Sequence, residues 1–523
     1  MLPGIAVVAA AFLLTLALVA ALRHPPTPEE RAQALLHSGK VAEAERAYRD
    51  LLEKSPSAKL VLAFLDAHRY AKVFQLKLDK NESRNDSVEK SLPIGKSLTE
   101  EEVDQVIEAL PPDVRTIGRF ARDFDPSPEV LEDLGAGAKR EPPMPYANEL
   151  LARLAMHQDK LPEAADFYEK EGIWFEERRG DVDESLRIRM HLDDWEGARA
   201  RLADPRVAAA ASPHPKYELA VHDRDWKTAA RWLPVLWAPR LVGSGLVLSA
   251  MTALGWFFFC ARLGKLGERP KFRLPMYLLA FALGVCSVAP TVLLIAVEEA
   301  KLHLHETGDP ARDILFFVFG VGLREEASKL LMFLPLLPLL RRWGDKLDVL
   351  VCGAMVGLGF AAEENLGYLA DGNLHNGLGR FLTANFFHMA MTGTLASALD
   401  DFLRDREKFA ADFSRTSVFI VGIHGAYDFL LSHDEYGGTY LAMTAFVFLT
   451  RMFLNAVEVA RRRADRGLTP LHAFVFAVSL VVGVTLAYAT LAVGPKLALG
   501  MMGAGLIGEG IIVYVFVRTL RTL

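Results

Sequence analysis

Long apolar segments are the feature that most constrains how this chain can fold. A helix needs about 20 predominantly apolar residues to cross the hydrocarbon core of a bilayer. Segments of about that length occur at 2–22, 240–262, 275–298, 313–340, 347–369, 380–402, 415–432, 439–460, 470–494 and 497–518. Because backbone polar groups inside a bilayer must be paired within the protein, these segments predict an all-α transmembrane bundle of about nine or ten spans.

The charged residues are concentrated between the first and second apolar segments. This division predicts three parts: a membrane anchor or signal peptide at 1–23, a charged helical domain at 24–232, and a multi-pass domain at 233–523 whose core lies at about 275–460. A secretory signal begins with a positively charged stretch. The first segment has no such stretch, and Arg23 follows it, so we interpret it as an uncleaved anchor.

The distribution of lysine and arginine predicts the orientation of the bundle. Every second loop is basic, at 262–273, 341–346, 404–415, 461–466 and 518–521, whereas the intervening loops are acidic or rich in glycine and asparagine. Short basic loops stay in the cytoplasm. The charged domain at 24–232 is therefore predicted to be extracytoplasmic. The formal net charge of −6 gives no indication of a nucleic-acid-binding surface.

Residues 32–56 resemble a tetratricopeptide repeat, which is a helix–turn–helix unit. Gly39, Ala44, Tyr48 and Pro56 fall at the spacings of that repeat; a second copy contains Ala164 and Tyr168, and looser copies contain Ala198 and Ala229. Such repeats stack into surfaces that bind other proteins. The alternative is a generic helical domain whose helices only look like repeats.

Ionisable residues inside the apolar segments are expensive in a bilayer and usually functional. The segment 313–340 contains Glu325, Glu326 and Lys329. Glu325 and Lys329 are four residues apart and therefore share a helix face, on which they can pair. Two adjacent carboxylates with a lysine one turn later suit a site where one acid stays ionised and the other titrates.

The next three apolar segments carry further polar residues at comparable depths. The segment 347–369 contains Phe360, Glu363, Glu364 and Asn365; the segment 380–402 contains His388; and the segment 415–432 contains His424 and Asp428. His424 and Asp428 are one turn apart, so the carboxylate can orient the imidazole. We predict that four consecutive helices direct these groups into one pocket that opens on the extracytoplasmic side.

Acids and imidazoles together suit the activation of water. A carboxylate can take the proton of a water molecule while a histidine assists the leaving amine or the oxyanion. Alternatively, glutamate and histidine hold Zn²⁺, which lowers the pKa of its bound water. The chain has no HExxH motif, and no serine or cysteine stands in a recognisable nucleophile setting.

The order of these motifs resembles the PrsW family, a branch of the superfamily of CAAX-prenyl endopeptidases and bacteriocin-related membrane proteases. The resemblance covers about 275–460 and implies an intramembrane endopeptidase of the bacterial inner membrane that cleaves a membrane protein, such as an anti-sigma factor, at a first site. Its implied catalytic residues are Glu325, Glu326, Glu364, His388, His424 and Asp428, supported by Lys329, Phe360, Glu363 and Asn365. Candidate ligands for Zn²⁺ or another divalent metal are Glu326, Glu364, His388 and His424.

Two other functions remain open from the sequence. Chains of Glu, His and Asp in a membrane also relay protons, as in a proton-coupled transporter. Transporters usually contain internal repeats with broken helices, and the motif set is not repeated between the halves of this domain. A non-catalytic receptor or scaffold would use the repeat-like domain alone, and the intact set of acids and imidazoles argues against it.

Overall fold

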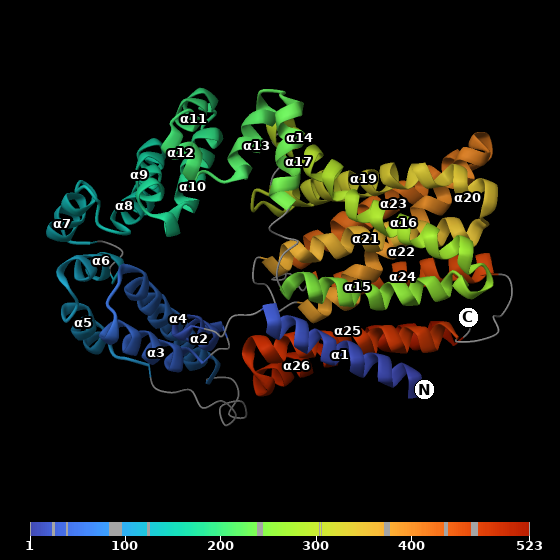
Figure 1. Ribbon diagram of the computed structural model, residues 1–523, viewed down its shortest axis with the longest axis horizontal. Helices are drawn as coiled ribbons and strands as arrows, with labels where there is room; N and C mark the ends of the chain where they lie inside the picture. Colours follow the sequence, from blue (N-terminus) through green and yellow to red (C-terminus); the bar gives the residue numbers. More distant parts are fainter. Residues whose placement is uncertain are drawn as a thin grey trace. The chain divides into compact units, whose positions relative to one another are not determined.

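The computed structural model describes residues 2–22, 27–37, 40–82, 97–122, 126–237, 244–302, 304, 306–370, 377–433, 438–461 and 469–521. Throughout these ranges the regular structure is helical and no strand occurs, which confirms the all-α prediction. The chain forms two compact units (Figure 1). One is Pro25–Leu236, and the other combines Met1–His24 with Trp237–Leu523. We call them the helical unit and the bundle.

The helical unit is a succession of short amphipathic helices. They are α2 (Pro28–His37), α3 (Val41–Lys54), α4 (Ala58–Glu82), α5 (Glu100–Glu108), α6 (Pro112–Arg122), α7 (Pro128–Ala138), α8 (Ala147–His157), α9 (Leu161–Trp174), η1 (Glu176–Arg178), α10 (Gly180–His191), α11 (Trp195–Leu202), α12 (Pro205–Ala210), α13 (Pro213–His222) and α14 (Trp226–Trp237). A capping box begins α5, in which the side chains of Thr99 and Glu102 each accept the backbone N–H group of the other residue.

A common turn joins several helix pairs of this unit. A residue with positive φ stands five positions before a fully buried alanine in three of them: Asp159 before Ala164, Asp193 before Ala198, and Arg224 before Ala229. The next amide closes each turn on a carbonyl of the preceding helix, at 2.8 to 2.9 Å. A buried alanine lets two helices approach closely. These shared turns support the repeat interpretation, and the assignment to tetratricopeptide repeats stays a prediction.

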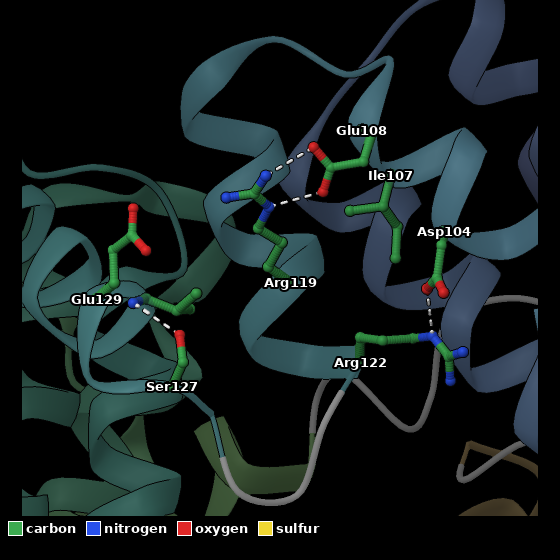
Figure 2. Close-up of a pocket in the computed structure, with 8 residues that line it drawn as sticks. Asp104, Ile107, Glu108, Arg119, Arg122, Ser127 and Glu129 are labelled. Carbon is green, nitrogen blue, oxygen red and sulfur yellow. Dashed lines mark hydrogen bonds and ion pairs between the residues drawn. The ribbon is translucent and has the colours of Figure 1, made fainter. Parts of the chain in front are cut away.

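The helical unit also contains an open pocket of about 280 Å³ beside α5, α6 and α7 (Figure 2). Its charged groups pair with one another. Arg119 forms a two-pronged ion pair with Glu108 at 2.6 and 2.7 Å, and Arg122 donates to Asp104 at 3.1 Å. Exposed pairs of this kind fasten helices together weakly. We therefore interpret the pocket as a gap at the interface of these helices and assign no function to it.

The bundle contains the long helices. They are α1 (Leu2–Leu22), α15 (Ser244–Leu263), η3 (Leu266–Glu268), α16 (Pro270–Cys286), α17 (Val288–Leu302), α18 (Pro310–Leu315), η4 (Phe316–Gly322), α19 (Leu323–Phe333), η5 (Leu334–Leu336), α20 (Leu337–Trp343), α21 (Lys346–Ala370), α22 (Gly377–Arg404), α23 (Arg406–Ser432), α24 (Gly438–Arg461), α25 (Pro470–Val493) and α26 (Pro495–Leu520). Helix α1 packs along α25 and α15 (Figure 1).

Four of the predicted spans satisfy both the length and the hydropathy expected of a membrane helix within the described residues. They are Gly245–Leu263, Pro270–Ile295, Leu441–Arg461 and Pro470–Leu491. The bundle is thus a multi-pass membrane domain. The other predicted segments also contain helix, and their crossing of the bilayer stays a prediction.

The segment 313–340 departs from the prediction of one continuous helix. It is divided into α18, a π-helical stretch η4, α19, a 3-10 turn η5 and α20. Pro335 lies in η5 and Pro338 at the start of α20, where a proline removes a backbone donor and breaks the regular pattern. Single π-turns inside helices are frequent at functional sites. Here the π-turn directly precedes the helix that carries Glu325 and Glu326.

Helices α21 and α22 form the centre of the bundle. They pack against each other and are surrounded by α15, α16, α19, α23, α24 and α25 (Figure 1). Every residue from Leu347 to Glu363 on α21 is buried. A helix buried on all its sides is expected to be apolar all round, and only Asp348 and Glu363 depart from this within the stretch. Gly357 lets the two helices touch, because a Cβ there would lie 2.2 Å from the carbonyl oxygen of His388.

An ion-pair cluster fastens the end of the bundle that lies farthest from Glu364 on α21. Arg273 on α16 is 1% exposed and donates to Asp348 at 2.6 Å and to Asp345 at 3.1 Å. Asp348 stands 16 residues before Glu364, which is about 24 Å along the helix. The two polar clusters of the bundle are therefore separated by its apolar core.

Glu171 is a fully buried titratable group of the helical unit. It lies on α9 and accepts the backbone N–H groups of Tyr146 at 2.5 Å and of Asn148 at 3.1 Å, where α8 begins. Burial raises the pKa of Glu171 to about 7, and the nearby Asp181 carboxylate adds to the shift, while the two backbone hydrogen bonds oppose it. Burial also raises the pKa of Asp181, to about 6.

We expect the stability of the helical unit to decrease as the pH rises from 5 to 8. The pKa of Glu171 is higher in the folded state than its ordinary value of 4.5, so the folded state binds this proton more tightly. The stabilisation is complete below about pH 4.5 and is lost as the pH rises through about 7, a change of roughly 2–3 kcal/mol. The free energy of unfolding of the helical unit can be measured at each pH by hydrogen exchange of its amides in the full-length protein, corrected for intrinsic exchange rates. Glu171→Gln should remove most of the dependence of the unfolding free energy on pH, whereas Glu163→Gln, at an exposed position, should leave it unchanged. If Glu171→Gln shows the same pH dependence as the wild type, Glu171 is not the group responsible.

Candidate active site

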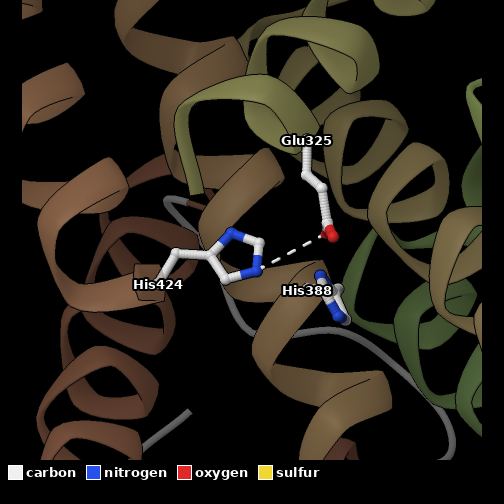
Figure 3. Close-up of side chains that lie close together, drawn as sticks. All are labelled: Glu325, His388 and His424. Carbon is white, nitrogen blue, oxygen red and sulfur yellow. Dashed lines mark ion pairs between the residues drawn. The ribbon is translucent and has the colours of Figure 1, made fainter. Parts of the chain in front are cut away.

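Four helices of the bundle bring the predicted site residues to one place, as the sequence predicts. The contributions are Glu325, Glu326 and Lys329 from α19, Phe360 and Glu364 from α21, His388 from α22, and His424 and Asp428 from α23. Figure 3 shows Glu325, His388 and His424 pointing toward one another from three of these helices. The roles assigned to these residues stay predictions, while their proximity is a feature of the structure.

Close backbone contact between η4 and α23 sets the position of His424. A Cβ on Gly425 would lie 2.4 Å from the Cα of Val318, and a Cβ on Gly322 would lie 2.7 Å from the carbonyl oxygen of Val421. Only glycine permits this approach, as in other small-residue helix contacts in membranes. The contact places His424 beside the first turn of α19.

Lys329 is the central cation of the site. It is completely buried, and its Nζ donates to Glu326 Oε1 at 2.8 Å, to Glu325 Oε2 at 3.3 Å and to His388 Nδ1 at 2.9 Å. The same ammonium lies 3.9 Å from the centre of the Phe360 ring, which is within cation–π range. The Glu325–Lys329 pair expected from the four-residue spacing is therefore present, and Lys329 also ties α19 to α22.

Glu326 is held from three sides. Besides Lys329, its Oε2 accepts the hydroxyl of Thr392 at 3.1 Å, and its Oε1 lies 3.1 Å from His424 Nδ1. Thr392 follows His388 by one helical turn on α22 and was not predicted from the sequence. A threonine hydroxyl in a membrane helix usually bonds to its own backbone, so its sequence gives no signal of this contact.

The hydrogen bonds of His388 fix which of its ring nitrogens carries the proton. Lys329 has only donors, so His388 Nδ1 must accept from it. Nε2 therefore carries the hydrogen and donates to Glu364 Oε2 at 3.0 Å. The resulting imidazole is neutral and directs a lone pair toward Lys329 and Glu325.

His424 faces carboxylates with both ring nitrogens. Its Nε2 lies 3.4 Å from Asp428 Oδ2 and 3.5 Å from Glu325 Oε2. Its Nδ1 is close to Glu326 at 3.1 Å, but the direction is not that of a hydrogen bond, so this buried nitrogen lacks an aligned partner. The rings of His424 and His388 meet edge to face with centres 5.2 Å apart.

An outer polar layer surrounds Glu364. Arg380, in the first turn of α22, lies 2.6 Å from Glu364 Oε1 and donates to Asn365 Oδ1 at 3.0 Å. Asn365 in turn donates to Asn385 Oδ1 at 3.0 Å. Asn365 was predicted as a supporting residue. Arg380 was not, because in the sequence it looks like the end of a loop. Glu363, the neighbouring predicted residue, is buried at 3% exposure, and its supporting role stays a prediction.

The exposure of the charged side chains increases from one side of the site to the other. Lys329 and Glu326 are essentially inaccessible, whereas the side chains of Glu364 and Asp428 are 25% and 32% exposed. The site therefore opens past these two acids.

The side chains fit a divalent metal. One ligand atom each from Glu325, His388 and His424 lies within 4.8 Å of the others, and all three residues are buried. Two imidazoles and one carboxylate form a donor set used by catalytic zinc, which keeps a further position open for water. The lone pair of His388 Nδ1, shared at present with Lys329, would have to turn to the metal. Glu325 thus fits a ligand role better than Glu326 or Glu364, whose oxygens face Lys329, Thr392, His388 and Arg380.

A second group of possible ligands lies outside this site. Glu306, Asp313 and His433 also place ligand atoms within 4.8 Å of one another. However, the carboxylate of Asp313 accepts the backbone N–H groups of Thr307 at 2.7 Å and Gly308 at 2.9 Å. Asp313 therefore stabilises the loop that precedes α18 through these hydrogen bonds, and we assign no metal to this group.

Comparison with known proteins identifies the central part of the bundle. Residues 273–454 match the family model of the PrsW family intramembrane metalloproteases, over roughly a third of the chain. The match includes every predicted site residue and excludes the helical unit. No curated protein and no solved structure matches the chain.

The contact between η4 and α23 makes a prediction about stability. Gly425→Ala should lower the melting temperature of the purified bundle in detergent, because its Cβ would overlap the backbone of Val318 and force α23 away from α19. Overpacking of this kind costs typically about 1–3 kcal/mol. Gly422→Ala is the matched control, since a Cβ at Gly422 on the same helix meets nothing within 4 Å. Equal melting temperatures for the two variants would show that the helices do not pack this closely.

Proposed function

We propose that this protein is an endopeptidase that hydrolyses a peptide bond of a membrane-associated protein, because residues 273–454 match the model of the PrsW family intramembrane metalloproteases. The observation that carries the proposal is the convergence of Glu325, His388 and His424 from three helices. These residues are far apart in the sequence, and a bundle that needed only stability would gain little by burying them together.

Glu325, His388 and His424 are the proposed holders of the metal. A divalent ion in such a site polarises the scissile carbonyl and lowers the pKa of a coordinated water. His388 is backed by Glu364, with a hydrogen bond of 3.0 Å, whereas Glu326 lies 3.1 Å from His424 Nδ1 without the alignment of a hydrogen bond. Carboxylates behind ligating histidines fix the ring orientation and raise the basicity of the ligand.

Glu326 is the proposed general base. It is adjacent to Glu325 in the chain, is not part of the ligand group, and has its charge balanced by Lys329 at 2.8 Å. In the proposed hydrolysis the water oxygen bonds to the carbonyl carbon while the water proton passes to Glu326. The proton then moves to the amine as the carbon–nitrogen bond breaks. Glu364 and Asp428, the more exposed acids, line the entrance for the substrate.

The proposed substrate is a single-pass protein of the bacterial inner membrane, such as an anti-sigma factor that is cut at a first site. The proposal is supported by the family match and by the site's opening past Glu364 and Asp428, on the side predicted to be extracytoplasmic. Cleavage near the outer surface would suit a regulator whose exterior part responds to a signal.

The helical unit is proposed to recognise the exterior part of the substrate. Its repeated helix pairs present exposed apolar side chains, including Trp174, Trp226 and Leu192, of the kind that bind protein partners. Deletion of residues 27–232 should change which substrates are cut and leave the basal cleavage of a short transmembrane peptide intact. Loss of the peptide cleavage in a folded deletion variant would contradict this division of roles.

Two substitutions separate the proposed roles in the site. The full-length protein is reconstituted in liposomes with candidate single-pass substrates, new termini are identified by mass spectrometry, and bound metal is measured by elemental analysis. Glu326→Gln should retain the metal and lower kcat by about 10²–10⁴-fold, as expected for loss of a general base. His424→Ala should lose both the metal and the cleavage. A chelator should abolish cleavage by the wild type, and added Zn²⁺ should restore it.

The control for these variants is His472→Ala, which removes an exposed imidazole at the start of α25. It should leave metal content and cleavage unchanged. Cleavage that persists in Glu326→Gln and His424→Ala would eliminate the proposed site. Cleavage that is lost in both variants but survives the chelator would favour hydrolysis by carboxylates and imidazoles without a metal. Proton-coupled transport with no cleavage would favour the transporter.

A further inference from the structure

Arg380 is a strongly charged group beside the site that the proposed reaction does not use. It stands in the first turn of α22, two turns before His388, and its side chain is 20% exposed. Its three contacts all reach one stretch of α21. The guanidinium lies 2.6 Å from Glu364 Oε1, donates through Nε to Asn365 Oδ1 at 3.0 Å, and lies 3.5 Å from the centre of the Tyr368 ring.

These contacts restrain the guanidinium in position and in orientation. The planar face is stacked on an aromatic ring, while the edge meets a carboxylate and an amide in two different directions. The contact from Nη2 to Glu364 is an ion pair and not an aligned hydrogen bond. The attraction between Glu364 and Arg380 therefore depends on the charge of Arg380, while the contacts with Asn365 and Tyr368 set the orientation of the guanidinium. A lysine cannot reproduce this combination, because it is a point charge without a flat face.

Glu364 connects Arg380 to His388. One oxygen faces the guanidinium at 2.6 Å, and the other accepts the Nε2 hydrogen of His388 at 3.0 Å. A carboxylate with one oxygen held in this way has little freedom to rotate. The second oxygen is therefore kept on Nε2, and the Nδ1 lone pair of His388 remains directed toward Glu325 and Lys329.

A second set of hydrogen bonds also links α21 to α22. Because Arg380 donates to the oxygen of Asn365, the amide nitrogen of Asn365 is free to donate to Asn385 Oδ1 at 3.0 Å. Asn385 then donates to the backbone carbonyl of Phe381 at 3.1 Å, one turn before it. Asn385 itself stands three residues before His388. Asn365 thus links the two helices beside the Glu364–His388 hydrogen bond, through both Arg380 and Asn385.

We infer that Arg380 is a positioning residue: through Glu364 it keeps Nε2 of His388 on the carboxylate, so that Nδ1 is the ring nitrogen left to bind the divalent metal in place of Lys329. This inference rests on the proposed function, since it concerns the same site. Arg380 itself does not contact the reacting atoms in this proposal and acts only through Glu364. Substitutions of groups that orient metal-binding histidines typically weaken metal affinity by about 10–100-fold.

The test measures metal affinity, which a general loss of packing would not change selectively. Full-length protein in nanodiscs is freed of metal and titrated with Zn²⁺ by competition with a fluorescent chelator, while unfolding is followed separately. Arg380→Met should weaken Zn²⁺ binding by about 10–100-fold. Arg380→Lys should fall between this variant and the wild type. In combination with Glu364→Gln, Arg380→Met should add little further loss, because both changes break the same connection.

The matched control is Arg341→Met. Arg341 also forms an ion pair with a carboxylate of α22, Asp400, with a hydrogen bond of 2.8 Å from its Nε, but this pair does not touch the site. It should leave Zn²⁺ affinity unchanged even if it lowers the melting temperature. If Arg380→Met does not fold, Arg380→Lys and Glu364→Gln still decide the question.

The outcomes separate this inference from the proposed function. Wild-type affinity in Arg380→Met and Arg380→Lys, with normal cleavage by the wild type, overturns the inference and leaves the protease intact. Fully additive losses in the double variant would also overturn it, because the two residues would then act independently. A wild-type protein that binds no divalent metal removes both the inference and the metal-dependent form of the proposed function.

Discussion

A buried lysine organises the site on which the account of this protein depends. An ammonium removed from water is costly unless opposite charges and hydrogen-bond acceptors replace the lost hydration. Lys329 is completely inaccessible, and Glu325, Glu326 and His388 supply its acceptors. These partners come from two helices, and Glu326 in turn contacts His424 on a third. Satisfying this cation therefore requires α19 and α22 to converge, and Glu326 extends the cluster to α23.

The apolar packing makes this convergence possible at short range. Gly357 brings α21 against the backbone beside His388, and Gly425 brings α23 against η4. Close approach of this kind places imidazoles and carboxylates within 3 to 3.5 Å of one another. Around the buried centre, Glu364 and Asp428 form a more exposed layer. The site is therefore graded from a dry interior to an accessible entrance, which suits hydrolysis inside a membrane domain.

The sequence predicted the convergence of the four helices, because ionisable residues in apolar segments are rare and their spacing along a helix reveals which of them share a face. It did not predict Arg380 or Thr392, since neither has a partner at helical spacing; their partners, Glu364 and Glu326, lie on other helices. Whether Glu325 or Glu326 is a metal ligand stays a prediction. The two are about 100° apart on the helix, and the π-turn that precedes them changes the rotation of α19 in a way the sequence does not show.

The central claim is that Glu325, His388 and His424 bind one divalent metal, and X-ray absorption spectroscopy of the zinc-loaded full-length protein tests it most directly. If these residues bind the metal, the zinc should be surrounded by nitrogen and oxygen ligands at about 2.0–2.2 Å, and the spectrum should include the outer-shell scattering of two imidazoles. Sulfur at about 2.3 Å would place the metal at a cysteine. That result, or a shell without imidazole scattering, would contradict the claim.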